Sequence, residues 1–113
     1  MTRGIHDTVY ADFVDGAFDS PEQAKLRVSE LFDEYYEKDP FVHVMDAPPQ
    51  TKQTWGNNDC LIYPTVDKHT GRLMVFAVLD NLVKGAAGQA IQNMNLMFGL
   101  PEATGLEQLA VYP

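Results

Sequence analysis

The stretch LMVFAVLDNLVKGAAGQAIQNMNLMFGL, residues 73–100, decides the fold of this chain. Its first part, Leu73 to Leu79, is a continuous apolar run, which predicts a central strand buried on both faces. The glycine-rich segment 85–88 then predicts the start of a helix that runs to about Phe98, where Gly99 fits the C′ position. We therefore expect a strand end, a tight turn and a helix in direct succession.

The helix expected here carries no charged residue between Gly85 and Pro101. Its polar side chains are amides, and its apolar ones form a stripe at helical spacing: Gln89, Gln92, Asn93 and Asn95 against Ala87, Ile91, Met94 and Phe98, with Ala90 and Met97 beside them. An exposed helix normally carries Lys and Glu, so we expect this one to meet a ligand or a partner domain. Its first turn offers free N–H groups and a positive dipole end, which suit an anion or a polar amide. The alternative is a helix packed on a sheet, with glycines that serve only close packing.

Upstream of this stretch, the pattern predicts a strand followed by a helix. Residues 5–13 have strand character because Ile5, Val9, Ala11 and Phe13 share one parity. A strand so near the first residue favours a piece cut from a longer protein. Residues 20–23, Ser-Pro-Glu-Gln, form a helix start with a capping box, and Asp39-Pro40 ends that helix. Its acidic run, Glu30 to Glu37, indicates a solvated face.

Two short strands complete the pattern, at residues 41–45 and 60–66, and residues 67–72 have the composition of a hairpin loop. We predict an α+β fold of order β-α-β-β-β-α, in which helices pack on a mixed, largely antiparallel sheet within one domain, residues 1–113. The tail, residues 106–113, has few anchors of its own. We expect it to lie on a surface, which could belong to another domain.

Composition excludes several classes of function. The 113 residues carry a formal net charge of -8, which repels phosphate backbones and anionic lipid, so no nucleic-acid or membrane partner is expected. No apolar run is long enough to cross a bilayer, and the polar start predicts no signal peptide. One cysteine and three scattered histidines supply no disulfide and no zinc spacing, so we expect no metal and a cytoplasmic location.

Few side chains suggest chemistry. Asn81 and Lys84 follow the expected buried strand, where an Asn can hold a carboxamide and a Lys can meet phosphate or carboxylate; a turn Asn and a solvated Lys are equally consistent. Cys60 is expected to be buried and inert, and Arg3 either binds an anion or belongs to a fluid terminus. His6 and His43 are expected to be structural and His69 solvated. These residues alone name no reaction, because no nucleophile–base pair stands out.

Residues 80–100 closely resemble the C-terminal signature of the N-acetyl-gamma-glutamyl-phosphate reductases. They resemble more weakly the aspartate-semialdehyde dehydrogenases, which share the pattern Asp-Asn-Leu-x-x-Gly-Ala-Ala. Residues 1–5, 35–42, 56–60 and 102–106 are similar to other parts of the reductases in the same order, so the resemblance covers nearly the whole chain. His43 and Trp55 depart from the residues usual in that family. The resemblance implies a glyceraldehyde-3-phosphate dehydrogenase-like C-terminal domain.

The resemblance also implies an activity, namely reduction of an acyl phosphate to an aldehyde with NADPH in arginine biosynthesis. In that family a cysteine thiolate attacks the acyl phosphate and a histidine assists. Both residues and the Rossmann domain precede the region matched here, so we expect this chain to contain no catalytic residue and to be inactive alone. A stand-alone, non-catalytic dimerisation or ligand-binding module is the alternative. A small cysteine enzyme that uses Cys60 is a third hypothesis.

Site residues follow from the resemblance position by position. Asn81 is expected to contact the nicotinamide carboxamide of NADP, and Gly85, Ala86 and Gly88 to form the cofactor-facing helix start, with Gln89 or Asn93 assisting. Arg3, Asn58 and Lys84 are candidates for the side that binds the small-molecule acyl phosphate. The resemblance further implies that the last helix packs on the missing Rossmann domain and that the sheet makes a homo-oligomer contact.

Overall fold

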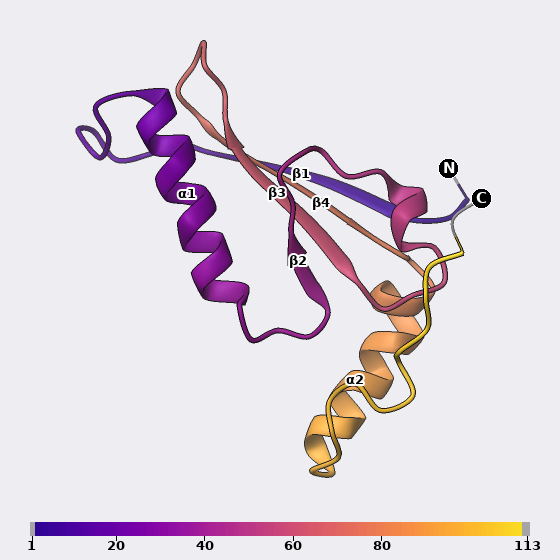
Figure 1. Ribbon diagram of the computed structural model, residues 1–113. Helices are drawn as coiled ribbons and strands as arrows, with labels where there is room; N and C mark the ends of the chain where they lie inside the picture. Colours follow the sequence, from indigo (N-terminus) through magenta and orange to yellow (C-terminus); the bar gives the residue numbers. More distant parts are fainter. Residues whose placement is uncertain (1, 112–113) are drawn as a thin grey trace.

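The computed structural model describes residues 2–111 and contains one four-stranded sheet with two main helices (Figure 1). Strands β1 (Ile5–Ala11), β4 (Leu73–Leu79), β3 (Cys60–Val66) and β2 (Val42–Val44) lie side by side in that order. β4 runs antiparallel to both neighbours, whereas β2 is parallel to β3. The predicted α+β class, element order and mixed, largely antiparallel sheet are confirmed.

The β3–β4 hairpin fixes the register of the sheet. Ile62 lies opposite Ala77, which lies opposite Asp7 on its other side, so these three residues share one face. The loop that joins the two strands closes with a hydrogen bond from Asp67 N to Arg72 O of 2.9 Å, and Gly71 takes a φ of 70°. That left-handed conformation suits glycine, as the loop composition predicted.

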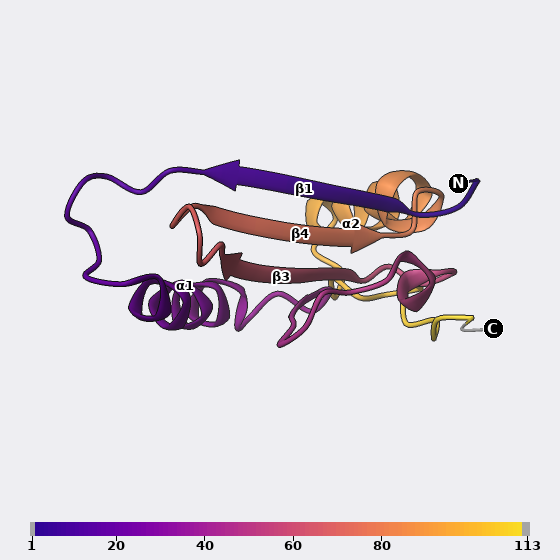
Figure 2. The same ribbon diagram turned by 90° about the horizontal axis from the view of Figure 1, so that it is seen from above.

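Helix α1 (Pro21–Tyr36) begins where its capping residues predict. Gln23 N donates to Ser20 Oγ at 3.2 Å, and the Gln23 side chain accepts from Asp19 N at 2.8 Å, so two N–H groups at the helix start are satisfied. The helix buries Ala24 and Val28 and packs mainly on β3 and β2. Figure 2 shows α1 alongside β3, with β4 and β1 beyond.

The prediction that β4 is buried on both faces is wrong for the described chain. β4 is central in the sheet, but Val78 is its one buried residue and the other six are half-buried. The physical reason is that α1 covers β3 and β2, while α2 (Gly88–Met97) projects from the end of β4 instead of lying over it (Figure 1). The apolar run of β4 is therefore only partly covered within residues 2–111.

We predicted that both helices pack on the sheet, but α2 instead extends from the end of β4. Its α-helical part starts at Gly88, three residues later than the predicted start at Gly85. A π-helical turn (Val83–Ala87) precedes it, with hydrogen bonds from Gly85 N to Asp80 O of 2.8 Å and from Ala87 N to Leu82 O of 3.1 Å. The C-terminal end is as predicted: Gly99 has a φ of 68°, and Leu100 N donates to Asn95 O at 2.8 Å.

The tail has more anchors than the sequence indicated. It runs back along α2 (Figure 1), with Leu106 only 3% exposed, and Val111 N donates to Trp55 O at 2.7 Å. It therefore lies on this domain up to Val111, although Leu109 and Val111 themselves are exposed. Tyr112, which the sequence grouped with these apolar residues, lies outside the described residues. Across residues 2–111, the helices fall short of the length and hydrophobicity that a bilayer span requires.

We expect Asn95→Ala to detach this tail. The Asn95 side chain is 1% exposed and donates through Nδ2 to Glu102 O at 3.0 Å and to Thr104 O at 2.9 Å. Its loss should leave two carbonyls unsatisfied and lower the free energy of unfolding by about 2 kcal/mol. Hydrogen exchange over residues 101–111 should accelerate. Asn93→Ala, on the exposed side of the same helix, is the matched control, and equal effects of the two substitutions would contradict the prediction.

Candidate functional site

The end of β4 is organised around the carboxylate of Asp80, which is fully buried. Arg3 donates to it through Nε at 3.0 and 2.9 Å and through Nη2 at 2.7 Å. The backbone N–H groups of Gly56 (2.6 Å), Leu82 (2.8 Å) and Val83 (3.2 Å) donate to the same carboxylate. One side chain thus fixes the first residues of the chain, the turn before β3 and the start of the π-helical turn.

The ionisation of Asp80 follows from these contacts. Burial by itself raises the pKa of Asp80, but the Arg3 guanidinium and the N–H groups of Gly56, Leu82 and Val83 together lower it from 3.8 to about 2. The carboxylate is therefore charged at neutral pH, and its charge is matched by Arg3.

Asn81 lies next to this junction and is half-buried. Its Oδ1 accepts a hydrogen bond of 2.6 Å from Gly4 N, which fixes the orientation of the amide. With Oδ1 engaged, Nδ2 is the group through which Asn81 can donate to a ligand oxygen. Gly85 and Ala86 beyond it are exposed, so their backbone is open to a close approach.

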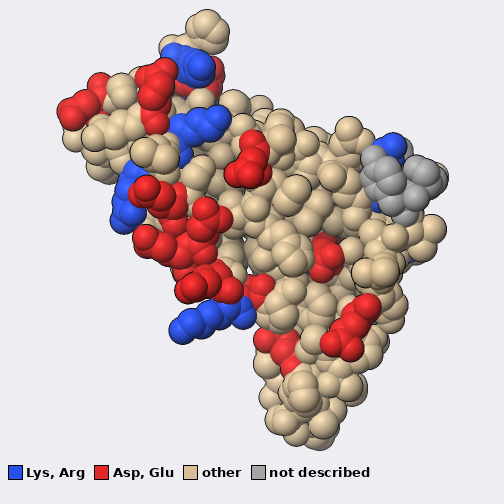
Figure 3. Space-filling view, viewed as in Figure 1, with Lys and Arg blue, Asp and Glu red and all other residues tan. Residues whose placement is uncertain are grey.

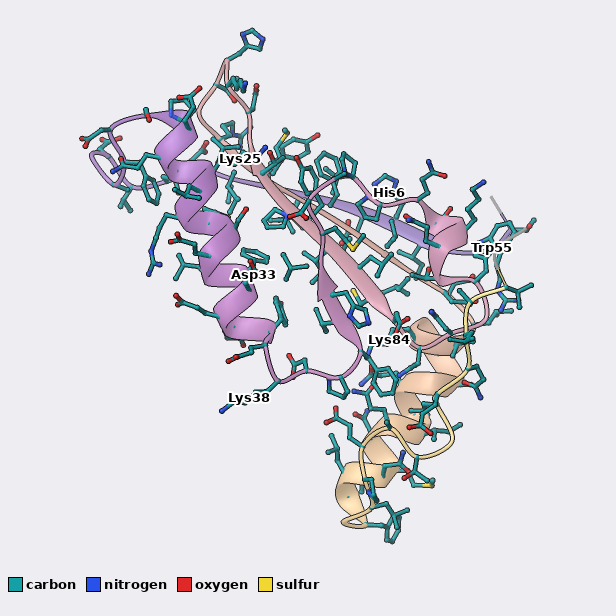
Figure 4. The ribbon with its side chains drawn as sticks, viewed as in Figure 1. His6, Lys25, Asp33, Lys38, Trp55 and Lys84 are labelled. Atoms are coloured by element: carbon teal, nitrogen blue, oxygen red, sulfur yellow. The ribbon has the colours of Figure 1, made fainter. Side chains whose placement is uncertain are left out.

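A second polar group, here called the Gln92 cluster, consists of Asn58, Lys84, Gln92 and Glu102. Gln92 Oε1 accepts from Asn58 Nδ2 at 2.9 Å and from Lys84 Nζ at 2.7 Å, and Gln92 Nε2 donates to Glu102 Oε1 at 2.7 Å. Figure 4 shows Lys84 at the junction between the sheet and α2. Burial lowers the pKa of Lys84, against the raising effect of nearby groups that include Glu102.

Gly88 is packed against this cluster and is buried, unlike Gly85 and Ala86. A Cβ on Gly88 would overlap Asn58 Oδ1 and would come within 2.8 Å of Val83 O. Asn58 is fully buried, and its Oδ1 has no hydrogen-bond partner within residues 2–111. Glycine at position 88 therefore allows close packing of the helix against Asn58. This agrees with the alternative interpretation, in which the glycines serve only close packing.

The structure thus groups the predicted site residues at the end of β4 in two sets. Arg3 and Asn81 belong to the Asp80 junction, and Asn58 and Lys84 to the Gln92 cluster. Arg3 also lines an open cavity of about 670 Å³ with Thr2, Trp55, Gly56, Leu82 and Val111. Sequence reasoning missed Asp80 and Glu102, and it gave no role to Gln92. The position of Asp80 directly after an apolar strand was the one available signal.

Cys60 and the histidines do not assemble a catalytic group. Cys60 is half-buried and not buried as expected, but burial raises the pKa of its thiol more than the neighbouring Lys84 lowers it, which agrees with an inert cysteine. His43 Nε2 lies 3.3 Å from Asp59 Oδ1. Among residues 2–111, no three His, Cys, Asp or Glu side chains come close enough together to hold a metal ion.

The fold is thus a mixed sheet crossed by one helix, with a charge-free helix leaving the end of β4. Residues 1–81 match the family model described as "Semialdehyde dehydrogenase, dimerisation domain", and the chain belongs to this family. The resemblance seen in the sequence is confirmed by curated relatives that match the chain end to end.

Three of these relatives are named N-acetyl-gamma-glutamyl-phosphate reductase. The protein from Heliobacterium modesticaldum is 50% identical over all of this chain and 32% of its own length. The one from Aquifex aeolicus is 49% identical over 99% of this chain and 30% of its own length. The one from Thermus thermophilus is 48% identical over 100% of this chain and 31% of its own length. The chain therefore spans about a third of the length of the curated relatives it matches.

Proposed function

We propose that residues 1–113 form the C-terminal substrate-binding and dimerisation domain of an N-acetyl-gamma-glutamyl-phosphate reductase, a cytoplasmic enzyme of arginine biosynthesis. The observation that carries this proposal is 50% identity over the whole chain to a relative of that name. The reaction proposed for the longer protein is NADPH-dependent reduction of N-acetyl-gamma-glutamyl phosphate to the semialdehyde. The chain alone is inactive in this proposal, because the nucleophilic cysteine and the histidine belong to the upstream part.

The cofactor side of the site is proposed to be Asn81 with the exposed backbone of Gly85 and Ala86. The residues fit this role, because the Asn81 amide is held by Gly4 N and has Nδ2 left to donate to a carboxamide oxygen. NADPH, when bound, supplies the hydride. Gly88 would contribute by letting α2 approach Asn58 closely, and the exposed Asn93 and half-buried Gln89, which are hydrogen-bonded to each other at 3.1 Å, are candidates to assist.

The substrate side is proposed to be the ammonium of Lys84, which would attract the phosphate or a carboxylate of the acyl phosphate. Gln92 fixes its position, and the buried Asn58 contributes through Gln92 because Asn58 has no exposed surface of its own. Arg3 is the weaker candidate, because its Nε and Nη2 are already engaged by Asp80.

The outer surface of α2 supports the proposal of a missing Rossmann domain. Its apolar stripe is exposed: Ile91 37%, Met94 44%, Met97 81% and Phe98 74%. Figure 3 shows a largely uncharged surface around α2, whereas acidic residues gather over α1. An exposed stripe of this kind marks an interaction site. In the proposed enzyme the upstream domain covers this stripe, and the sheet domain contacts a second copy.

The decisive experiment compares this chain with its full-length protein in an assay of NADPH oxidation with the acyl phosphate. We expect activity from the full-length protein and none from residues 1–113 alone. In the full-length protein, Asn81→Asp should raise KM for NADPH about tenfold, the effect of one lost hydrogen bond and an added repulsion. The substitution keeps an oxygen for Gly4 N but adds a second carboxylate beside Asp80, so a small loss of thermal stability is expected and the melting temperature is measured together with KM.

Gln23→Glu is the matched control, because it likewise keeps an oxygen acceptor, for Asp19 N, on the distant helix α1. It should leave KM unchanged. An unaltered KM in Asn81→Asp would remove Asn81 from the cofactor site while leaving the proposed activity intact. A folded full-length protein without reductase activity would refute the proposed function.

A further inference from the structure

Lys84 and Glu102 are the charged residues that flank the charge-free stretch 85–101, and one amide joins them in the structure. Gln92 Oε1 accepts from Lys84 Nζ at 2.7 Å, and Gln92 Nε2 donates to Glu102 Oε1 at 2.7 Å. Gln92 is only 8% exposed, so its amide lies between a cation and an anion with little access to water. The amide is fixed in this orientation, because the reverse one would set Nε2 against the ammonium and Oε1 against the carboxylate.

The tail does not need the Glu102 side chain in order to dock. The buried Asn95 amide holds the backbone carbonyls of Glu102 and Thr104 at 3.0 and 2.9 Å, and Leu106 is 3% exposed. The Glu102 carboxylate instead contacts Gln92, the same side chain that holds Lys84. Anchoring of the tail therefore does not account for this contact.

We propose that Glu102 is a positioning residue of the substrate side, which acts through Gln92 to keep the Lys84 ammonium in place and charged. The tail then completes this side of the site. The inference rests on the proposed function, in which Lys84 attracts the acyl phosphate. Lys84 has three N–H donors, and Gln92 uses one of them within residues 2–111, which leaves donors for the oxygens of a phosphate or a carboxylate.

The surroundings of Lys84 explain why its charge needs support. Burial lowers the pKa of Lys84, while titratable groups on four segments, namely β3, the turn before it, the tail and the turn after α1, raise it: Cys60, Asp59, Glu102 and Asp39. The Phe41 ring, whose centroid is 5.5 Å from Nζ, also favours a cation. Of the carboxylates, Glu102 is the one joined to Lys84 by hydrogen bonds, by way of Gln92. Loss of its charge should therefore lower the pKa of Lys84.

Competitive acetylation of the lysines in the full-length protein measures this effect without relying on activity, because acetic anhydride reacts with the neutral amine. Glu102→Gln keeps an oxygen for Gln92 Nε2 and removes only the charge. We expect the pKa of Lys84, taken from labelling against pH, to fall, so that labelling at pH 8 accelerates about threefold or more. The plateau rate at high pH should not change, because a plateau reports exposure. The exposed Lys25 is the internal reference.

Glu107→Gln is the matched control, because it removes the same charge at an exposed position of the same tail. It should leave the labelling of Lys84 unchanged. A pKa of Lys84 that does not respond to Glu102→Gln, or that responds equally to Glu107→Gln, would overturn the proposal.

Steady-state kinetics of the full-length protein test the role in the site. At pH 8, Glu102→Gln should raise KM for the acyl phosphate about threefold, whereas kcat and KM for NADPH should stay within about twofold. A lowered pKa of Lys84 with an unaltered KM for the acyl phosphate would overturn the positioning role while leaving the proposed function intact. A folded full-length protein without reductase activity would refute the proposed function and, with it, the substrate role of Glu102.

Discussion

Replacing Asp80 with Asn is expected to lower the free energy of unfolding by about 2–3 kcal/mol at neutral pH, because buried N–H donors lose a charged acceptor, whereas the Arg3 side chain is 37% exposed and keeps part of its hydration. The Arg3 guanidinium would lose its counter-charge, and the amide would offer one oxygen where the carboxylate offers two. The N–H groups of Gly56, Leu82 and Val83 compete for that oxygen. Urea denaturation followed by circular dichroism measures the change.

The chain provides a matched control for this substitution. Arg72 Nε lies 2.7 Å from Asp12 Oδ1, so this pair has the same chemistry, but the Asp12 side chain is 74% exposed. Asp12→Asn should therefore cost less than about 1 kcal/mol. Equal effects of the two substitutions would show that burial and the backbone donors at Asp80 contribute little.

The same carboxylate should make stability depend on pH. Because the pKa of Asp80 falls from 3.8 to about 2 on folding, the ionised form stabilises the fold above about pH 4. This contribution, about 2 kcal/mol, is lost as the pH falls from about 4 towards 2. Asp80→Asn should flatten that part of the profile. Parallel profiles for the two proteins would contradict the assignment.

The second large effect is expected for Gly88→Ala. Alanine is favoured over glycine in a helix by about 1 kcal/mol, so an exposed site would gain stability. Here the added methyl would overlap Asn58 Oδ1 and approach Val83 O to 2.8 Å, and Asn58 is held in place by Gln92. We expect a net loss of about 2–3 kcal/mol, the range for overpacking.

Gly85→Ala is the control for this prediction. Its Cβ would lie 3.3–3.4 Å from Leu79 Cδ1, Ile5 Cδ1 and Asp80 O, where the two side chains can adjust, so we expect a change below about 1 kcal/mol. Asn58→Ser should partly rescue Gly88→Ala, because the shorter side chain frees the space of Oδ1. Additive effects of Asn58→Ser and Gly88→Ala would contradict the proposed contact.

The parts of the fold that sequence could predict are those with local causes. The Ser20 cap, the Gly71 loop and the Gly99 helix end each depend on conformations of a few adjacent residues, and each is observed. The contacts of the candidate site were harder to predict from the sequence. Arg3 and Asp80 are separated by 77 positions, so nothing local in the sequence links them. Asn58, Lys84, Gln92 and Glu102 likewise meet only once α2 and the tail are in place.

The errors on burial have a different cause. A continuous apolar run such as Leu73–Leu79 predicts that the strand is buried, but it does not indicate which segment or domain buries it. In residues 2–111 that strand is half-buried, and α2 extends from its end with an exposed stripe. Both observations agree with a domain whose apolar surfaces are completed by parts outside the described chain, as proposed above.

The two ends of the described chain meet at one place on the domain. Thr2, Arg3 and Val111 line one cavity, Arg3 is bound to Asp80, and Val111 is bound to the Trp55 backbone beside Gly56. Any segment attached to either end would therefore leave the domain from the same place, at the end of the sheet opposite the β3–β4 hairpin tip (Figure 1).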